Sequence, residues 1–163
     1  MDKIINERVL NLFDNNFLDF QFDNIKLKYD TKKLLKDYQF MHVADLKNSI
    51  QNFNIAIDCS STGTGKTFTS VALCKELNLK PIIICTKSNI INWFNICRKF
   101  GVEPIGVSNY ESMRNCRIFN KELKSEKCSF LTKNLNEEFK WDIKNPKNTI
   151  LIYDEAHKCK NNK

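Results

Sequence analysis

The chain has 163 residues, which is enough for one domain with its own hydrophobic core. Its apolar content of 42% and its 12 Phe exclude a disordered chain, and no apolar run reaches the roughly 18 residues of a membrane-spanning helix. The N-terminus MDKIINERVL does not resemble a signal peptide, so we expect an intracellular protein that is not secreted and has no membrane partner. The net charge of +7 favours an anionic partner such as nucleic acid.

In chain order, the first predicted elements are helices. Residues 1–22 place apolar side chains near helical spacing, and we assign residues 1–30 to an N-terminal helical extension. Residues 31–52 predict one or two further helices. The inward side of these helices is expected to carry Leu34, Leu35, Tyr38, Met41, Val43 and Leu46.

Strands and helices then alternate along the chain. The apolar run 53–59 (FNIAIDC) predicts a strand, and residues 66–77 (KTFTSVALCKEL) predict an amphipathic helix. A second strand is expected over 81–86 and a second helix over 88–100, which Gly101 would end as a C-cap.

The last part of the chain changes character twice. Residues 103–107 predict a short strand, and residues 115–148 form a polar, weakly periodic excursion. This excursion is open to interpretation as a partner-binding or nucleic-acid element, or as an insertion. Residues 149–154 (TILIYD) are continuously apolar up to their last residue, which is typical of a buried parallel strand. The alternation predicts an α/β fold with a mainly parallel sheet and helices on both faces.

The seven Cys residues are expected to be reduced thiols inside the fold. None forms a C-x-x-C pair, so the spacing of a zinc ribbon is absent. Cys59, Cys74, Cys85 and Cys97 all lie within apolar patterns, which is typical of buried thiols in a reducing compartment.

Residues 60–67 read SSTGTGKT between a predicted strand and a predicted helix, which is the context of a phosphate-binding loop. Its two glycines can adopt positive φ angles and let the backbone approach an anion, while the helix N-terminus supplies partial positive charge. Lys66 would reach the β- and γ-phosphates of ATP, and Thr67 would place its hydroxyl on Mg²⁺. Ser60 departs from the general pattern G-x-x-x-x-G-K-[ST]. The predicted nucleotide-binding residues are Ser61, Thr62, Gly63, Thr64, Gly65, Lys66 and Thr67.

Asp154 and Glu155 directly follow the last predicted strand. The carboxylate of Asp154 would emerge at the carboxyl edge of the sheet, where open α/β sheets bind their ligands. Because the loop at 60–65 also follows a predicted strand, we expect the two sites to meet. Asp154 would then hold Mg²⁺, and Glu155 would orient and deprotonate the attacking water. Together with Lys66, these two carboxylates form the predicted catalytic set.

The phosphate loop and the DEAH sequence at 154–157 together resemble those of superfamily 2 helicases and translocases, which often have Ala or Ser in place of the first Gly. LKDYQ (35–39) is similar to the Leu-x-x-Tyr-Gln signature that precedes the loop in that family. PIIICTKSNIINWFNICRKFG (81–101) and VSNYESMR (107–114) resemble the segments that follow it. DEAHKCKN (154–161) is close to the ending found in the Swi/Snf-like branch, and comparable sequences occur in helicases of large DNA viruses and phages.

This resemblance covers about residues 31–161 and implies further roles. Gln39 would contact adenine, although its position also fits an exposed helix residue. Thr86, Lys87 and Ser88 would lie near the nucleic-acid backbone, although the same turn fits an ordinary helix start. His157 would couple the nucleotide site to other parts of the enzyme.

Superfamily 2 enzymes bind ATP between two RecA-like domains, and the resemblance implies that residues 31–163 form an incomplete first domain. The implied function is the ATP-binding half of a nucleic-acid helicase or translocase that uses ATP and Mg²⁺. We expect weak or no ATP hydrolysis without a second helicase domain, in cis or in trans. The expected location is the cytoplasm, the nucleus, a viral factory or a virion.

Two other interpretations stay open. One is a non-catalytic, helicase-derived protein that binds nucleic acid or a partner protein. The other is a P-loop ATPase or kinase outside the helicases. Trp93 and Trp141 are better explained as core residues than as platforms for base stacking.

Overall fold

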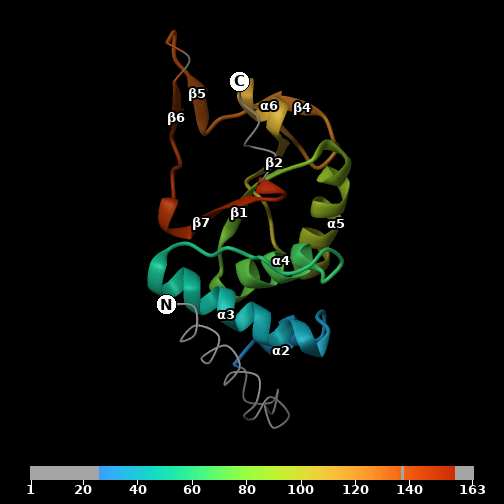
Figure 1. Cartoon of the computed structure of the whole chain (residues 1–163). Coiled ribbons are helices and arrows are strands. Elements are labelled where there is room, and N and C mark those ends of the chain that lie inside the picture. The colour runs from blue at the N-terminus through green and yellow to red at the C-terminus, as the bar shows by residue number, and fades with distance from the viewer. Residues whose placement is uncertain (1–25, 137, 157–163) are drawn as a thin grey trace, which may run out of the picture.

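The computed structural model describes residues 26–136 and 138–156, so the expected helix over 1–22 lies outside the described residues (Figure 1). A five-stranded sheet with the order β4-β3-β2-β1-β7 organises this part of the chain. Its central strands run parallel: β1 (Lys80–Cys85) pairs on one side with β2 (Gly106–Asn109) and on the other with β7 (Thr149–Tyr153). The predicted α/β fold is confirmed.

The excursion at 115–148 divides into two β-hairpins. β3 (Arg117–Phe119) and β4 (Ser125–Lys127) join the edge of the main sheet in antiparallel pairing beside β2. β5 (Leu131–Lys133) and β6 (Phe139–Trp141) form a separate two-stranded sheet that projects away from the rest (Figure 1).

The helices lie where the sequence places them. α4 (Lys66–Leu77) and α5 (Ile90–Phe100) match the two predicted helices, and Gly101 ends α5 with a φ angle of 67°. Residues 31–52 form two helices as expected, α2 (Tyr29–Lys32) and α3 (Asp37–Phe53). The remaining helical elements are α6 (Tyr110–Arg114) and the 3₁₀ helices η2 (Lys87–Asn89) and η3 (Pro146–Asn148). None of the described helices has the length and apolar character needed to cross a membrane.

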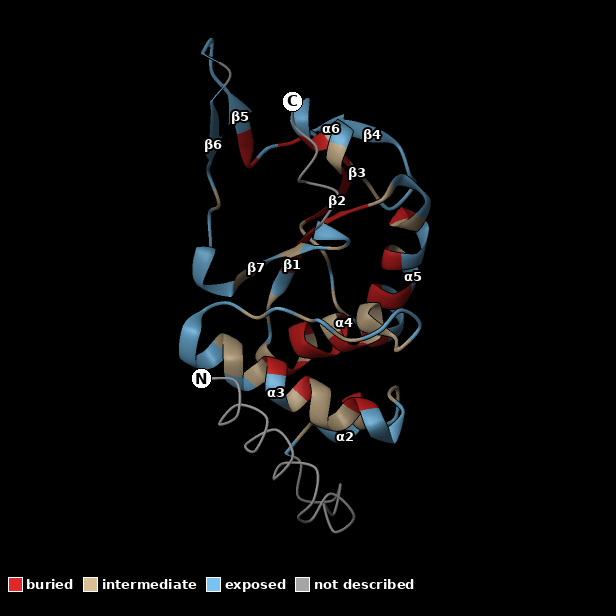
Figure 2. Ribbon diagram, viewed as in Figure 1, coloured by how far each residue is buried: buried red, intermediate tan, exposed pale blue. Residues whose placement is uncertain are grey.

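Alternate residues of β1 point into two different cores, because successive side chains of a strand face opposite sides of the sheet. Ile83 and Cys85 join the core under α4 and α5. Ile82 and Ile84 join the core on the other face, which includes Met113 of α6. β1 is therefore buried on both faces and helices cover both sides of the sheet, as predicted (Figure 2).

The predicted strand over 53–59 is wrong. Phe53 is the last residue of α3, and residues 55–61 follow without regular structure. Ile55 and Ile57 are 62% and 78% exposed. A strand must pair its backbone N–H and C=O groups, and both edges of β1 are already taken by β2 and β7. The outer edge of β7 has no described partner strand, yet the segment does not pair there, and its apolar pattern carries no information about strand pairing.

Three further expectations need correction. β7 pairs with β1 and with no other described strand, and Leu151 and Tyr153 are exposed, so it is an edge strand rather than a buried one. Tyr38 points outward from α3 with 54% exposure, although Val43 and Leu46 are buried as expected. The short strand predicted over 103–107 begins later, at Gly106.

Candidate functional site

The loop at 60–65 is folded back on itself in front of α4. Gly63 and Gly65 both have φ angles of 87°, which L-residues with a side chain rarely adopt. The Thr64 hydroxyl donates to the Ser61 carbonyl at 2.9 Å and lies 2.9 Å from the Ser60 hydroxyl. The first N–H groups of a helix have no partner within the helix, so the N-terminus of α4 presents donors beside this loop. The two glycines at positive φ and the donors of α4 favour the predicted role of this loop in phosphate binding.

Lys66 reaches back over the loop. Its ammonium group donates to the carbonyl oxygens of Ser60 at 2.7 Å and Ser61 at 3.4 Å. Phosphate oxygens are stronger acceptors for an ammonium group than neutral carbonyl oxygens. The cation therefore sits within reach of an anion bound at the loop and can exchange carbonyl partners for phosphate.

Gln39 holds the loop from α3. It is buried, its Oε1 accepts from the Lys36 N–H at 2.9 Å, and its Nε2 donates to the Thr64 carbonyl at 3.0 Å. A Cβ atom on Gly65 would lie 2.4 Å from this Nε2, so glycine is required there by contact as well as by φ. The interpretation of Gln39 as an exposed helix residue is wrong, because its amide joins the start of α3 to the phosphate loop.

Asp154 is held at the carboxyl edge of the sheet by three polar side chains. Its Oδ2 accepts from Asn89 Nδ2 at 2.9 Å and from Trp93 Nε1 at 3.0 Å. The Tyr110 hydroxyl donates to its backbone carbonyl at 2.5 Å. Both of these side-chain donors act on Oδ2, and no described residue donates to Oδ1. Glu155 follows, exposed and with a φ angle of 59°.

The sequence does not predict contacts of Asn89, Trp93 and Tyr110 with Asp154, although residues 108–114 lie in a segment whose family resemblance implies a place near nucleic acid. Trp93 was assigned to the core, and it is indeed only 2% exposed, but its indole N–H reaches the carboxylate. The available signal was position: all three residues follow the carboxyl ends of β1 and β2. Polar side chains after parallel strands gather at one edge of the sheet.

Cys85, the last residue of β1, lies close to Asp154. Burial, with a smaller contribution from the negative charge of Asp154, raises the pKa of its thiol to about 12. The thiol is therefore neutral near pH 7. Among the other described cysteines, Cys74 and Cys97 are buried as expected, whereas Cys59 is exposed because the segment 55–61 is not part of the sheet.

The structure does not bring the phosphate loop and Asp154 together. Phe68, in the first turn of α4, packs edge-on against Phe100 with ring centroids 6.0 Å apart, so the loop lies at the C-terminal end of α5. Asp154 bonds to Asn89 and Trp93 at the other end of that helix. The 11 residues of α5 span about 16 Å. The expected meeting of the sites fails here because residues 53–59, which should carry the loop to the carboxyl edge, form no strand.

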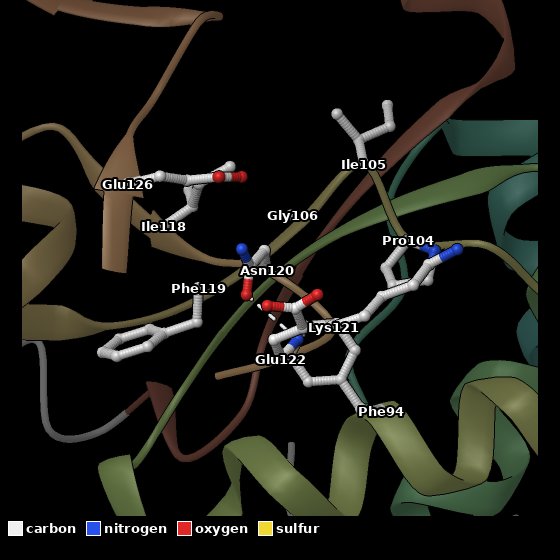
Figure 3. A pocket seen from close by; sticks show the side chains of 10 residues that line it. All are labelled: Phe94, Pro104, Ile105, Gly106, Ile118, Phe119, Asn120, Lys121, Glu122 and Glu126. Atoms are coloured by element: carbon white, nitrogen blue, oxygen red, sulfur yellow. Dashed lines mark hydrogen bonds between the residues drawn. The ribbon is translucent and has the colours of Figure 1, made fainter. Parts of the chain in front are cut away.

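The predicted nucleic-acid turn directly follows β1. Lys87 and Ser88 are exposed in η2, and the Thr86 and Ser88 hydroxyls lie 3.3 Å apart. His157 lies outside the described residues. The structure also contains a cavity of about 320 Å³ between Phe94 of α5 and the turn joining β3 to β4 (Figure 3). None of the predicted site residues lines this cavity.

Both halves of the site fit the chemistry of a magnesium nucleotide. Mg²⁺ prefers oxygen ligands and is usually held by one or two protein groups together with phosphates and water. The Thr67 hydroxyl and the Asp154 carboxylate are ligands of that kind. The described residues contain no cluster of three or more His, Cys, Asp or Glu, as a fully protein-enclosed metal site would need.

Residues 32–163 match the family model described as the res subunit of type III restriction enzymes. A protein of Acanthamoeba polyphaga mimivirus, named as an ATP-dependent RNA helicase, is 33% identical over 147 residues, which cover 85% of this chain and 27% of that relative. No solved structure matches the chain. The chain therefore belongs to the family of type III restriction enzyme res subunits, with the helicase superfamily 2 domain that this family shares.

Proposed function

We propose that this chain is the ATP-binding half of an ATP-dependent nucleic-acid helicase or translocase. The observation that carries the proposal is the loop at 60–67, with two glycines at positive φ, the N-terminus of α4 behind it and the Lys66 ammonium folded over it. In this proposal Lys66 binds phosphate oxygens, Gln39 contacts adenine, and Thr67 and Asp154 hold Mg²⁺. The metal supplies charge neutralisation on the phosphates, and Glu155 orients and deprotonates the attacking water.

Hydrolysis requires the phosphate loop and Asp154 to approach each other. A second helicase domain, in cis or in trans, would supply both a surface that organises the two halves and arginines for the transition state. Arginine fingers of comparable enzymes contribute roughly 10³–10⁵ in rate. Because the chain corresponds to only 27% of its mimivirus relative, the activity of the complete enzyme is part of the proposal. We assign the chain to the Swi/Snf-like branch by its motifs, and to an intracellular site in an infected cell by its viral relative.

The separation of the two halves also favours a second candidate. A chain that keeps its phosphate loop away from Asp154 could serve as a non-catalytic protein that binds nucleic acid or a partner protein. Such a protein would have no need of Lys66, Thr67, Asp154 and Glu155 together, and the retention of all four favours the enzyme.

The first experiment measures equilibrium binding of a fluorescent ATP analogue to the unchanged chain and to Lys66→Ala. We expect the substitution to weaken binding by at least about tenfold, because it removes a charge-assisted contact to phosphate. The matched control is Lys127→Ala, an exposed lysine on β4 that keeps full affinity. Equal affinity of the unchanged chain and Lys66→Ala would overturn the nucleotide site.

The second experiment measures steady-state ATP turnover with and without RNA and DNA, beside Glu155→Gln. RNA is tested first, because the mimivirus relative is named as an RNA helicase. Turnover that is stimulated by one polymer and lost in Glu155→Gln would establish an enzyme. Nucleotide binding without such turnover, even after addition of a second helicase domain, would favour the non-catalytic protein.

A further inference from the structure

We propose that Asn89 and Trp93 are positioning residues that fix the Asp154 carboxylate and connect it to the turn at 86–88. This inference rests on the proposed function, because the metal-binding role of Asp154 is part of that function. Neither residue was predicted to act at the site.

The described side-chain donors at Asp154 fix one oxygen of its carboxylate. Both donors meet the same atom, Oδ2, at 2.9 and 3.0 Å, so the carboxylate cannot rotate without breaking two hydrogen bonds. Trp93 is almost fully buried, and a hydrogen bond to an ionised group is stronger where water is excluded. Both donors are neutral, so they orient the carboxylate without cancelling the negative charge that a divalent cation requires.

The backbone of Asp154 is anchored independently of its side chain. Its N–H donates to the Ile84 carbonyl at 2.8 Å, and its carbonyl accepts from the Tyr110 hydroxyl. The main chain is thus tied to β1 and to the start of α6, while the side chain is tied to η2 and α5. A shift of η2 or α5 would therefore act on the carboxylate selectively.

Asn89 is the last residue of η2 and directly follows the turn at 86–88 that is proposed to meet nucleic acid. Its N–H donates to the Thr86 carbonyl at 2.9 Å, and the neighbouring Lys87 and Ser88 are exposed. A phosphate backbone that binds Lys87 and Ser88 would move or fix η2, and with it the amide that holds Asp154. Asn89 alone thus connects the turn proposed to bind the polymer with Asp154, the proposed metal ligand.

The test compares nucleotide affinity in Mg²⁺ with nucleotide affinity in EDTA for two variants, Trp93→Phe and Asn89→Ala. Each removes one donor to Oδ2, and Trp93→Phe keeps most of the packing. We expect each to reduce the gain in affinity that Mg²⁺ provides by about tenfold, as for loss of one hydrogen bond to a charged group. Affinity in EDTA should not change, because neither residue contacts the phosphate loop. Asn92→Ala, which removes an exposed amide on the same helix, is the matched control and should behave like the unchanged chain.

A spectroscopic measurement accompanies the affinities. The chain has two Trp, so Trp141→Phe leaves Trp93 as the single reporter beside Asp154. We expect its fluorescence to change on addition of Mg²⁺ with ATP, and separately with a short oligonucleotide. Both changes should be reduced when Asp154→Asn is added. We also expect the oligonucleotide to alter the gain in nucleotide affinity that Mg²⁺ provides in the unchanged chain, but not in Asn89→Ala.

The outcomes separate the two proposals. If the unchanged chain binds no nucleotide, the proposed function fails and this inference falls with it. If the chain binds nucleotide with a Mg²⁺ gain that survives intact in both Trp93→Phe and Asn89→Ala, the inference alone is overturned. If the gain in nucleotide affinity from Mg²⁺ depends on Asn89 but does not change when the oligonucleotide is added, the connection to the turn at 86–88 is overturned.

Discussion

Gln39 shows how a single side chain can join two elements that are distant in sequence. Its amide oxygen accepts from the N–H of Lys36, the N-cap residue of α3, and its amide nitrogen donates to the carbonyl of Thr64, 25 residues later. The consequence falls on Gly65, which has no room for a Cβ beside that nitrogen. Gly63 has the same φ angle of 87° but faces open space. A side chain at Gly63 would therefore meet backbone strain alone, whereas one at Gly65 would meet backbone strain and a steric clash.

The first residue-scale prediction compares Gly65→Ala with Gly63→Ala. Gly63→Ala should lower the free energy of unfolding by about 1 kcal/mol, which is typical for a side chain at positive φ. Gly65→Ala should cost more and should also weaken ATP binding, because its Cβ displaces the Gln39 amide from Thr64. Urea denaturation and nucleotide titration of both variants measure these effects. Equal losses in the two variants would contradict the placement of Gln39 against the loop.

At the scale of elements, local signals predicted most of the fold. α4, β1 and α5 follow from apolar periodicity and from Gly101 as a helix end, all of which lie within a few residues of the element itself. The site was less predictable. The hydrogen bond from Trp93 to Asp154 joins residues that are 61 apart in sequence. Periodicity assigns a buried Trp to the core, but it does not show whether the indole N–H also donates to a site residue.

The strand prediction over 53–59 was wrong for a related reason. Its alternating apolar residues satisfy the local pattern of a strand, but strand formation depends on backbone pairing with another strand that comes from a distant part of the chain. In the structure the segment pairs with none of the described strands, including the edge strand β7, and short-range patterns do not contain this outcome.

The element-scale prediction follows from this difference in burial. Ile83→Ala in β1 should lower the free energy of unfolding by about 2–5 kcal/mol, because it leaves a cavity in a fully buried position. Ile57→Ala should change it by less than about 0.5 kcal/mol, because that side chain is 78% exposed. Chemical denaturation of the two variants measures both values. A loss in Ile57→Ala as large as that in Ile83→Ala would show that the segment is buried as a strand after all.

At the scale of the whole molecule, α4 and α5 pack against each other over a core that contains several thiols. Cys85 of β1 and Cys97 of α5 belong to this core, and Cys74 of α4 is also fully buried. Burial raises the pKa of Cys97 to about 12, and it raises the pKa of Cys74 as well, with a smaller contribution from Cys97. These thiols are neutral in the folded chain at pH values where the unfolded chain would already have lost their protons.

The difference in thiol pKa between the folded and the unfolded chain determines how stability depends on pH. A thiol in the unfolded chain titrates near pH 8.5–9, and the folded state resists deprotonation up to about pH 12 for Cys97. The contribution of the buried, neutral Cys97 thiol to the free energy of unfolding is thus fully present below about pH 8.5 and is lost as the pH rises toward 12. Each such thiol lowers the free energy of unfolding by at most about 1.4 kcal/mol per pH unit in that window.

We therefore expect the free energy of unfolding to fall between pH 8 and pH 10.5, measured by urea denaturation in the presence of a reductant. Tyr and Lys also titrate near pH 10, so the informative quantity is the fall in each variant relative to the unchanged chain. Cys97→Ala should show a smaller fall, because it removes one resisting thiol. Cys59→Ala, which removes an exposed thiol, should show the same fall as the unchanged chain. An identical fall in all three proteins would mean that Cys97 is accessible to solvent, and hence that α4 and α5 do not enclose this core.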